Sequence, residues 1–129
     1  MKHQEYDLQK AVCNYLNLQY PEVLYISTGT SLKLTKNQAV RNKAIQKNIF
    51  KCPDLLIFKR RYGSQGLFIE LKIEDPLRKN GNFKSEHIKA QYETICELNK
   101  LGYHACFAVG FDEAKRIIDG YLTSSNDVF

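Results

Sequence analysis

The sequence has no tryptophan, one methionine, three prolines and no long run of apolar residues. A helix that crosses a bilayer needs about 20 consecutive apolar residues, so the sequence predicts neither a membrane span nor a membrane partner. The first five residues, from Met1 to Glu5, also lack the apolar stretch of a secretory signal peptide. We therefore expect a soluble protein that resides in the cytoplasm.

The four cysteines are widely spaced and form no C-x-x-C pair. This spacing excludes a zinc knuckle and a dithiol redox motif. Two disulfides could form in principle, but Cys13 and Cys96 lie in helical apolar patterns and Cys106 lies in an apolar strand. These positions favour reduced thiols that pack as small apolar side chains.

The 129 residues include 19 Lys or Arg and 14 Asp or Glu, which gives a formal charge of +5. A chain of this size can bury roughly two-thirds of its unfolded surface, and its composition, 43% apolar and 26% charged, is that of a globular protein. It leaves no room for a second complete domain. We expect a single domain over residues 1–129, with a core over about 4–122 and a C-terminal tail over 123–129.

Apolar periodicity predicts four helices and four strands in the order α-β-α-β-β-α-β-α. Gly63 and Gly66 mark a hairpin between the second and third strands, while Ser85 and Asp112 are predicted caps of the last two helices. The pattern indicates an α/β fold with a mixed β-sheet flanked by helices. The predicted helices cover 4–20, 37–47, 86–101 and 112–122, and the predicted strands cover 23–27, 54–59, 67–73 and 103–109.

The strand from Leu67 to Ile73 alternates between apolar and charged residues. Glu70 and Lys72 share one face of this strand, because successive side chains point to opposite sides. Taken alone, such a pair is most often an exposed ion pair of little energetic value.

Asp54 gives this pair another interpretation. A hairpin that turns around Tyr62 to Ser64 places Asp54 opposite or next to Glu70 and Lys72, and facing side chains lie about 5 Å apart. Two close carboxylates repel each other unless a cation joins them. A hard divalent metal ion with oxygen ligands is the natural partner.

Two polar residues occupy apolar helix stripes. Glu5 precedes Leu8 by three residues, and Gln91 falls between Ile88 and Ile95. A polar group on a buried stripe must find a polar partner, although each could also lie at the edge of its stripe and reach water. We expect both side chains to point toward Asp54, Glu70 and Lys72.

Basic residues are concentrated between positions 33 and 61, where nine Lys or Arg accompany a single acid, Asp54. Most charge runs are solvated faces, but one that ends at a metal site is typical of a track for phosphate groups. Arg78, Lys79 and Lys84 could likewise hold a nucleic-acid strand or belong to a mobile loop. The predicted nucleic-acid-binding residues are Lys33, Lys36, Arg41, Lys43, Lys47 and Lys51.

Pro53-Asp54, followed after fifteen residues by Glu70-Leu71-Lys72, resembles the signature of the PD-(D/E)XK nuclease superfamily. Over about residues 4–122 the chain resembles the stand-alone VRR-NUC nuclease domains of viruses and bacteria. It departs from them before Pro53, where Gln46 and Lys51-Cys52 replace the glycines usual in that family. The resemblance to VRR-NUC domains is carried by Glu5, Lys43, Phe68-Ile-Glu-Leu-Lys, Gln91-Tyr-Glu-Thr and Gly102-Tyr103.

This resemblance implies a restriction-endonuclease-like core and a hydrolytic site. Asp54, Glu70 and the Leu71 backbone carbonyl would hold Mg²⁺, for which Mn²⁺ could substitute, and Glu5 would act through metal-bound water. Lys72 would activate the attacking water or offset charge on the phosphate, and Gln91 would orient Lys72 or water. The number of metal ions, one or two, is left open.

The function implied is that of a Mg²⁺-dependent DNA endonuclease, selective for branched DNA such as four-way (Holliday) junctions and active as a homodimer. A non-catalytic nucleic-acid-binding domain that retains the nuclease fold is the alternative. Two close carboxylates that face a polyanion argue against it. A sequence-specific restriction-type enzyme would need recognition elements for which the chain has little spare length.

Overall fold

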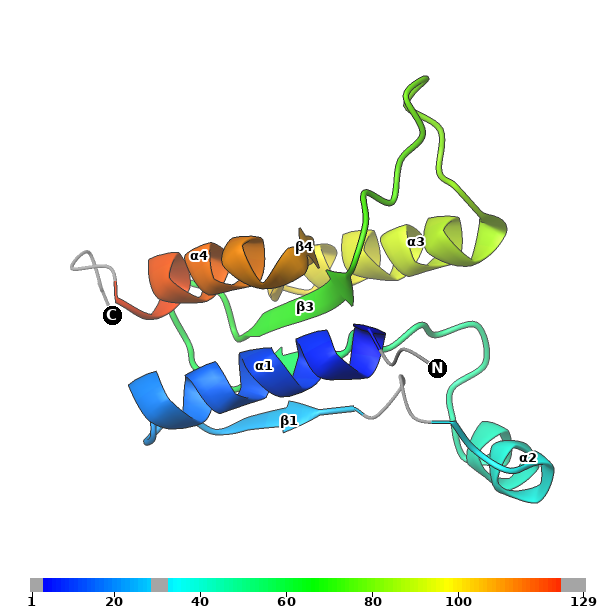
Figure 1. The fold of residues 1–129 in the computed structure, drawn as a ribbon, viewed down its shortest axis with the longest axis horizontal. Coiled ribbons are helices and arrows are strands. Elements are labelled where there is room, and N and C mark those ends of the chain that lie inside the picture. Colours follow the sequence, from blue (N-terminus) through cyan, green and yellow to red (C-terminus); the bar gives the residue numbers. More distant parts are fainter. Residues whose placement is uncertain (1–3, 29–32, 124–129) are drawn as a thin grey trace.

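The computed structural model of the protein describes residues 4–28 and 33–123 (Figure 1). The observed order of elements is the predicted one, and the observed strands are shorter than predicted. Of the predicted C-terminal tail, all but Thr123 lies outside the described residues. The elements are α1 (Gln4–Gln19), β1 (Tyr25–Ser27), α2 (Lys36–Ala44), β2 (Leu55–Ile57), β3 (Leu67–Lys72), α3 (Glu86–Lys100), β4 (His104–Val109) and α4 (Gly110–Leu122).

The four strands form one mixed sheet in the order β1-β2-β3-β4. The first two pairings are antiparallel and the pairing of β3 with β4 is parallel. The β2–β3 hairpin turns at Tyr62 and Gly63, which both have positive φ (52° and 76°), and Arg61 and Ser64 exchange backbone hydrogen bonds across it. Leu55 pairs with Ile69, so the hairpin has the register that its sequence predicts.

Helices cover both faces of the sheet (Figure 1). On one face, Val12 and Leu16 of α1 and Ile118 of α4 pack with Leu55 and Ile69 of the sheet. On the other face a smaller cluster joins α3 to β3 and β4 through Phe68, Ile95, Leu98 and Ala105. Strand β3 is therefore buried on both sides, and its polar residues cannot be ordinary surface residues.

A polar clip fastens α1 to α4. The hydroxyl groups of Tyr15 and Tyr20 each donate a hydrogen bond of 2.6 Å to the same carboxylate oxygen of Asp119. Lys115 donates to the other oxygen at 3.2 Å. The clip holds α1 against the sheet, and the N-terminal end of α1 thereby stays beside the ends of β2 and β3.

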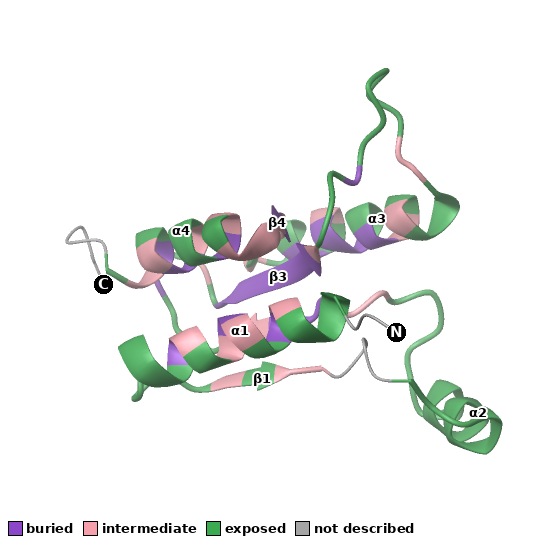
Figure 2. Cartoon of the chain, in the orientation of Figure 1, coloured by how far each residue is buried: buried purple, intermediate pink, exposed green. Residues whose placement is uncertain are grey.

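Helix α2 lies apart from this body and has no buried residue (Figure 2). It begins with a capping box in which the Thr35 hydroxyl accepts the Gln38 backbone N–H, and the Gln38 side chain accepts the Thr35 N–H. Two orphan N–H groups of the first turn are satisfied in this way. Local hydrogen bonds, and not packing, hold this helix.

The segment between β3 and α3 extends away from the body as an arm (Figure 1). Leu77 pairs with Phe83 across it, and Arg78 receives the Gly81 N–H on its carbonyl at 2.9 Å. The Phe83 ring packs on Tyr92 of α3 at 5.1 Å between ring centroids. The arm that carries Arg78, Lys79 and Lys84 is thus folded on itself.

Helix ends confirm one sequence prediction and correct another. Ser85 caps α3 by accepting the Ile88 N–H at 3.1 Å, and Gly102 follows α3 with a φ of 95°. Asp112 does not cap α4, because the helix begins two residues earlier, at Gly110. There the Glu113 carboxylate accepts the Val109 N–H at 3.0 Å in place of a cap from Asp112.

All four cysteines are free thiols, as predicted. Each is partly buried. Within residues 4–28 and 33–123, no helix has both the length and the apolar character required to span a membrane.

Candidate active site

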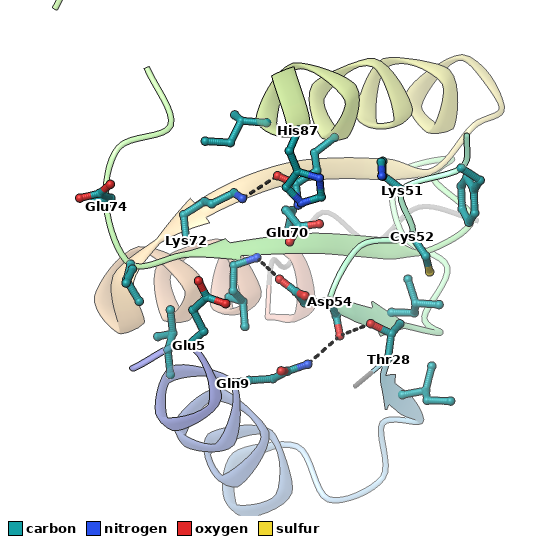
Figure 3. A pocket seen from close by; sticks show the side chains of 18 of the residues that line it. Glu5, Gln9, Thr28, Lys51, Cys52, Asp54, Glu70, Lys72, Glu74 and His87 are labelled. Atoms are coloured by element: carbon teal, nitrogen blue, oxygen red, sulfur yellow. Dashed lines mark hydrogen bonds between the residues drawn. The ribbon is translucent and has the colours of Figure 1, made fainter. Parts of the chain in front are cut away.

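Asp54 and Glu70 come together at the end of the β2–β3 hairpin (Figure 3). Leu55 pairs with Ile69, so Asp54 lies opposite Glu70 one residue further along the same register. Residues directly opposite in an antiparallel pair point to the same face. The register and the shared cavity thus bring the two carboxyl groups together, as the sequence predicts.

The backbone around Asp54 is held from three sides. One carboxylate oxygen of Asp54 accepts the Leu71 N–H at 2.9 Å. The Asp54 carbonyl accepts the Thr28 N–H at 2.9 Å and the Gln9 side-chain amide at 3.2 Å. The N–H and C=O of one strand residue lie on the same side, so the Leu71 carbonyl also faces the edge where Asp54 lies.

Glu70 is buried, with 5% of its surface exposed. Burial raises the pKa of its carboxyl to about 10, and the hydrogen bond and negative charge of Asp54 add to this effect, while Lys72 opposes it. Near neutral pH the metal-free protein therefore keeps a proton on Glu70, which a divalent cation would displace. The Asp54–Glu70 pair therefore favours a bound positive charge.

Lys72 projects beside Glu70 and is held by Gln91. The Lys72 ammonium donates a 2.6 Å hydrogen bond to the side-chain oxygen of Gln91 and lies 5.7 Å from the centroid of the Phe107 ring. Gln91 is buried, with 8% of its surface exposed, so the expectation of a buried polar residue on the α3 stripe is correct. The hydrogen bond to Gln91 thus sets the position of the Lys72 ammonium group.

Glu5 corrects the sequence analysis. It was expected on the buried stripe of α1, but it is exposed, because the buried stripe of this helix begins one turn later, at Gln9, Val12 and Leu16. The buried polar residue of this helix is Gln9, which donates to the Ser27 hydroxyl and the Asp54 carbonyl. Gln9 precedes Val12 by three residues and Leu16 by seven, the same anomaly that drew attention to Glu5. A polar residue on the apolar stripe of α1 is therefore buried with polar partners, as expected, but this residue is Gln9 and not Glu5.

A cavity of about 700 Å³ opens over these groups. Despite its exposure Glu5 lines this cavity, and Figure 3 shows its carboxylate on the side of Asp54. All the residues proposed for catalysis or metal binding thus share one cavity. They are Glu5, Asp54, Glu70, Leu71, Lys72 and Gln91.

Two further residues in the cavity wall were not predicted. His87 approaches the Gln91 amide nitrogen at 3.2 Å, and burial together with the charges of Lys51 and Lys72 lowers its pKa. Burial, Glu70 and Asp54 raise the pKa of Cys52, which keeps it a thiol. His87 could have been predicted from its position one helical turn before Gln91. Cys52 could have been predicted from its position two residues before Asp54.

The basic residues divide into two groups. Of the six predicted nucleic-acid-binding residues, Lys51 lines the cavity, together with the polar residues Asn42 and Gln46 from the α2 side. The other five, Lys33, Lys36, Arg41, Lys43 and Lys47, are exposed along or beside α2. The cavity lining therefore combines the Lys51 cation with the buried carboxyl groups of Asp54 and Glu70, and the other five cations lie outside it.

The donor set suits Mg²⁺ better than zinc. In the described part of the chain, no three His, Cys, Asp or Glu side chains gather as a metal-binding group. Mg²⁺ keeps several waters and is bound through one or two carboxylates, which Asp54 and Glu70 provide. Zinc, in contrast, requires three or four protein ligands of the nitrogen or sulfur type.

Comparison with solved structures identifies a family that this chain resembles in its fold. A structure described as a VRR_NUC domain protein has a TM-score of 0.59 to this chain and 26% sequence identity, over 92% of this chain and 87% of the other. This likeness in fold supports a VRR-NUC domain. No family model matches its sequence, and no curated protein matches it. The relationship is therefore visible in the fold and in a few motif residues.

The VRR-NUC domain is a nuclease domain. Its mixed sheet and flanking helices are those expected from the resemblance to this family. The strand pair that carries Pro53-Asp54 and Glu70-Leu71-Lys72 lies at the centre of the sheet, where β2 meets β3. The positions that form the superfamily signature are the ones that the fold brings to the cavity.

Proposed function

We propose that this VRR-NUC domain is a Mg²⁺-dependent endonuclease that hydrolyses phosphodiester bonds in branched DNA such as four-way junctions. The observation that carries this proposal is the pairing of Asp54 with Glu70 beside the Lys72 ammonium, in one cavity. A binding domain without catalysis has no use for two adjacent carboxylates on a surface that receives a polyanion.

Asp54, Glu70 and the Leu71 carbonyl would hold the Mg²⁺, and Glu5 would contribute through water. The ion would supply a Lewis acid for the phosphate and make a water molecule more acidic. Mn²⁺ prefers the same oxygen donors and would substitute.

The protein's own groups do the rest. Lys72 places a fixed positive charge where the phosphate becomes more negative in the transition state, and a charge held in advance needs no reorganisation during the reaction. Gln91 holds this ammonium with a 2.6 Å hydrogen bond. The Gln9 and Thr28 bonds to the Asp54 carbonyl keep the Asp54 carboxylate against Leu71.

The Lys and Arg side chains of residues 33–51 would contact the phosphate backbone of the DNA. Such contacts position a duplex without reading its sequence. Selectivity for branched DNA and activity as a homodimer are implied by the likeness to stand-alone VRR-NUC domains. Light scattering with and without DNA would measure the oligomeric state.

A panel of DNA substrates tests the proposal. A duplex, a single strand, a flap and a four-way junction of matched sequence are incubated with Mg²⁺, with Mn²⁺ and with EDTA. We expect cleavage of the junction with either metal ion and none with EDTA. Cleavage that survives EDTA or the Glu70→Gln substitution would refute the metal-dependent site, and equal cleavage of all four substrates would refute the selectivity.

A further inference from the structure

A turn between α2 and β2 has an unusual residue at its third position. Lys47 to Phe50 form this turn, and the Phe50 N–H donates to the Lys47 carbonyl at 3.3 Å. Ile49, the third residue, has a φ of 59°. Turns with positive φ at this position favour Gly or Asn, and a β-branched side chain there is strained. The chain places at this position a residue that the local backbone disfavours.

Packing within the protein does not explain the choice of isoleucine. Ile49 is 88% exposed, the highest value among the large apolar residues of the described chain. The next residue, Phe50, is 41% exposed and lines the cavity that holds Asp54 and Glu70. Residues with strained backbone cluster at active sites and ligand-binding sites. The apolar side chains of Ile49 and Phe50 are therefore available for contact with a partner outside the chain.

The charges around the turn indicate what kind of partner this is. Residues 33–51 contain six Lys or Arg and no Asp or Glu, and Lys47 and Lys51 border the two apolar side chains directly. This surface attracts a polyanion. Nucleic acid combines phosphate charge with flat apolar base faces, and these faces are accessible only where a base is unpaired or unstacked.

We propose that Ile49 and Phe50 form a wedge that packs against an unpaired or unstacked base next to the phosphate bound at Asp54 and Glu70. The inference rests on the proposed nuclease function and deepens it. The wedge gains contact only where the stack is already open, so it favours distorted or branched DNA over regular duplex without reading a sequence. Lys47 and Lys51 hold the flanking phosphates while the base meets the Phe50 ring.

Two DNA probes of equal length and charge test the wedge. One is a fully paired duplex, and the other carries three consecutive mismatches at its centre. Dissociation constants are measured by fluorescence anisotropy in EDTA, which prevents cleavage. We expect the wild-type protein to bind the mismatched probe about tenfold more tightly, since one base–aromatic stack has an effect of this order.

Phe50→Ala and Ile49→Asn should each reduce this preference to less than about threefold, with binding of the paired duplex kept within about twofold. Phe50→Tyr, which retains a ring, should keep the preference. Asn tolerates positive φ, so Ile49→Asn should melt no lower than the wild type and a loss of preference cannot come from unfolding. Leu24→Asn, a change at a residue 74% exposed outside the cavity, is the matched control and should keep the preference.

Three results would overturn the wedge. They are equal binding of the two probes by the wild type, an unchanged preference in both variants, and self-association of the wild type that Phe50→Ala abolishes, which would assign the turn to a second copy. Failure of the nuclease proposal looks different, because the wild type would then cleave no junction with Mg²⁺, whatever its preference between the two probes in EDTA.

Discussion

The two regions that line the cavity are built in opposite ways. The carboxylate end of the β2–β3 hairpin, with Asp54 and Glu70, is buried and hydrogen-bonded to the sheet and to α1. The basic segment, residues 33–51, contributes Lys51, Phe50 and α2, a helix without a buried residue. The groups proposed to hold a metal ion are fixed by the core. Groups that must follow a polymer of variable shape are carried by a helix that depends on its own caps.

Substitutions at the carboxylate end should have the largest effects on chemistry. Glu70→Gln and Lys72→Met each remove a charge needed in the transition state, so we expect cleavage to fall by about 1000-fold. Single-turnover assays with Mg²⁺ measure this loss. Affinity for DNA in EDTA should change by less than about threefold in Lys72→Met, because the basic segment is intact. A parallel loss of affinity would show that the two regions are not separable.

Substitutions in the basic segment should reverse that pattern. The double variant Lys43→Ala and Lys47→Ala should bind DNA about tenfold more weakly near physiological salt and reduce the slope of log K against log salt by about 1.8, as two lost phosphate contacts require. The melting temperature should stay unchanged, since both residues are exposed. Lys100→Ala with Arg116→Ala, an equal loss of charge at exposed positions outside the cavity, is the control. A control that weakens binding equally would mean that net charge alone decides affinity.

Stability of the metal-free protein should depend on Glu70 and on pH. The folded carboxyl has a pKa of about 10, against an ordinary value of 4.5 for glutamate. The folded state thus keeps a proton that the unfolded chain loses above about pH 4.5, and stability falls as the pH rises through this window. Glu70→Gln has no such proton to lose.

In EDTA, Glu70→Gln should therefore melt higher than the wild type, by several degrees at pH 8 and by less at pH 5. Differential scanning calorimetry at the two pH values measures the difference. Mg²⁺ should raise the melting temperature of the wild type alone. A variant less stable than the wild type at pH 8 would contradict the account of Glu70 as a buried, uncompensated carboxyl.

Substitution of the helix N-cap residues should have the smallest effect on stability. It also compares the two regions directly. Ser85→Ala removes the cap of α3, a helix packed on the sheet, and should lower the free energy of unfolding by about 1 kcal/mol. Thr35→Ala removes the equivalent cap of α2 and should leave global unfolding unchanged while hydrogen exchange in α2 becomes faster. Equal losses in global stability would mean that α2 folds as part of the core.

The sequence predicted most of what rests on periodicity and register. The α/β class, the element order and the facing positions of Asp54 and Glu70 follow from alternation in one strand and from a hairpin of defined length. Lys72 and Gln91 were also expected to meet, although they are 19 positions apart and the whole arm lies between them. Each of these features is fixed by local pattern or by motif spacing.

Features set by tertiary geometry were missed. The start of α1 exposes Glu5 and buries Gln9, whose side chain bonds Ser27 and the Asp54 carbonyl, partners that are distant in the sequence. Asp112 failed as a cap because Glu113 could reach the Val109 N–H from inside the helix. The positive φ of Ile49 contradicts its residue type, and no rule of turn composition would have predicted it.

Calorimetric titration of Mn²⁺ into the metal-free protein at pH 7 tests the central claim most directly. Asp54 and Glu70 should bind the ion in the wild type, and titrations in buffers of different ionisation enthalpy should reveal the release of about one proton per protein, the proton of Glu70. Glu70→Gln should show neither binding heat nor proton release. Absence of Mn²⁺ binding by the wild type, or binding that is unchanged in Glu70→Gln, would contradict the assignment of this carboxylate pair as the metal site of a nuclease.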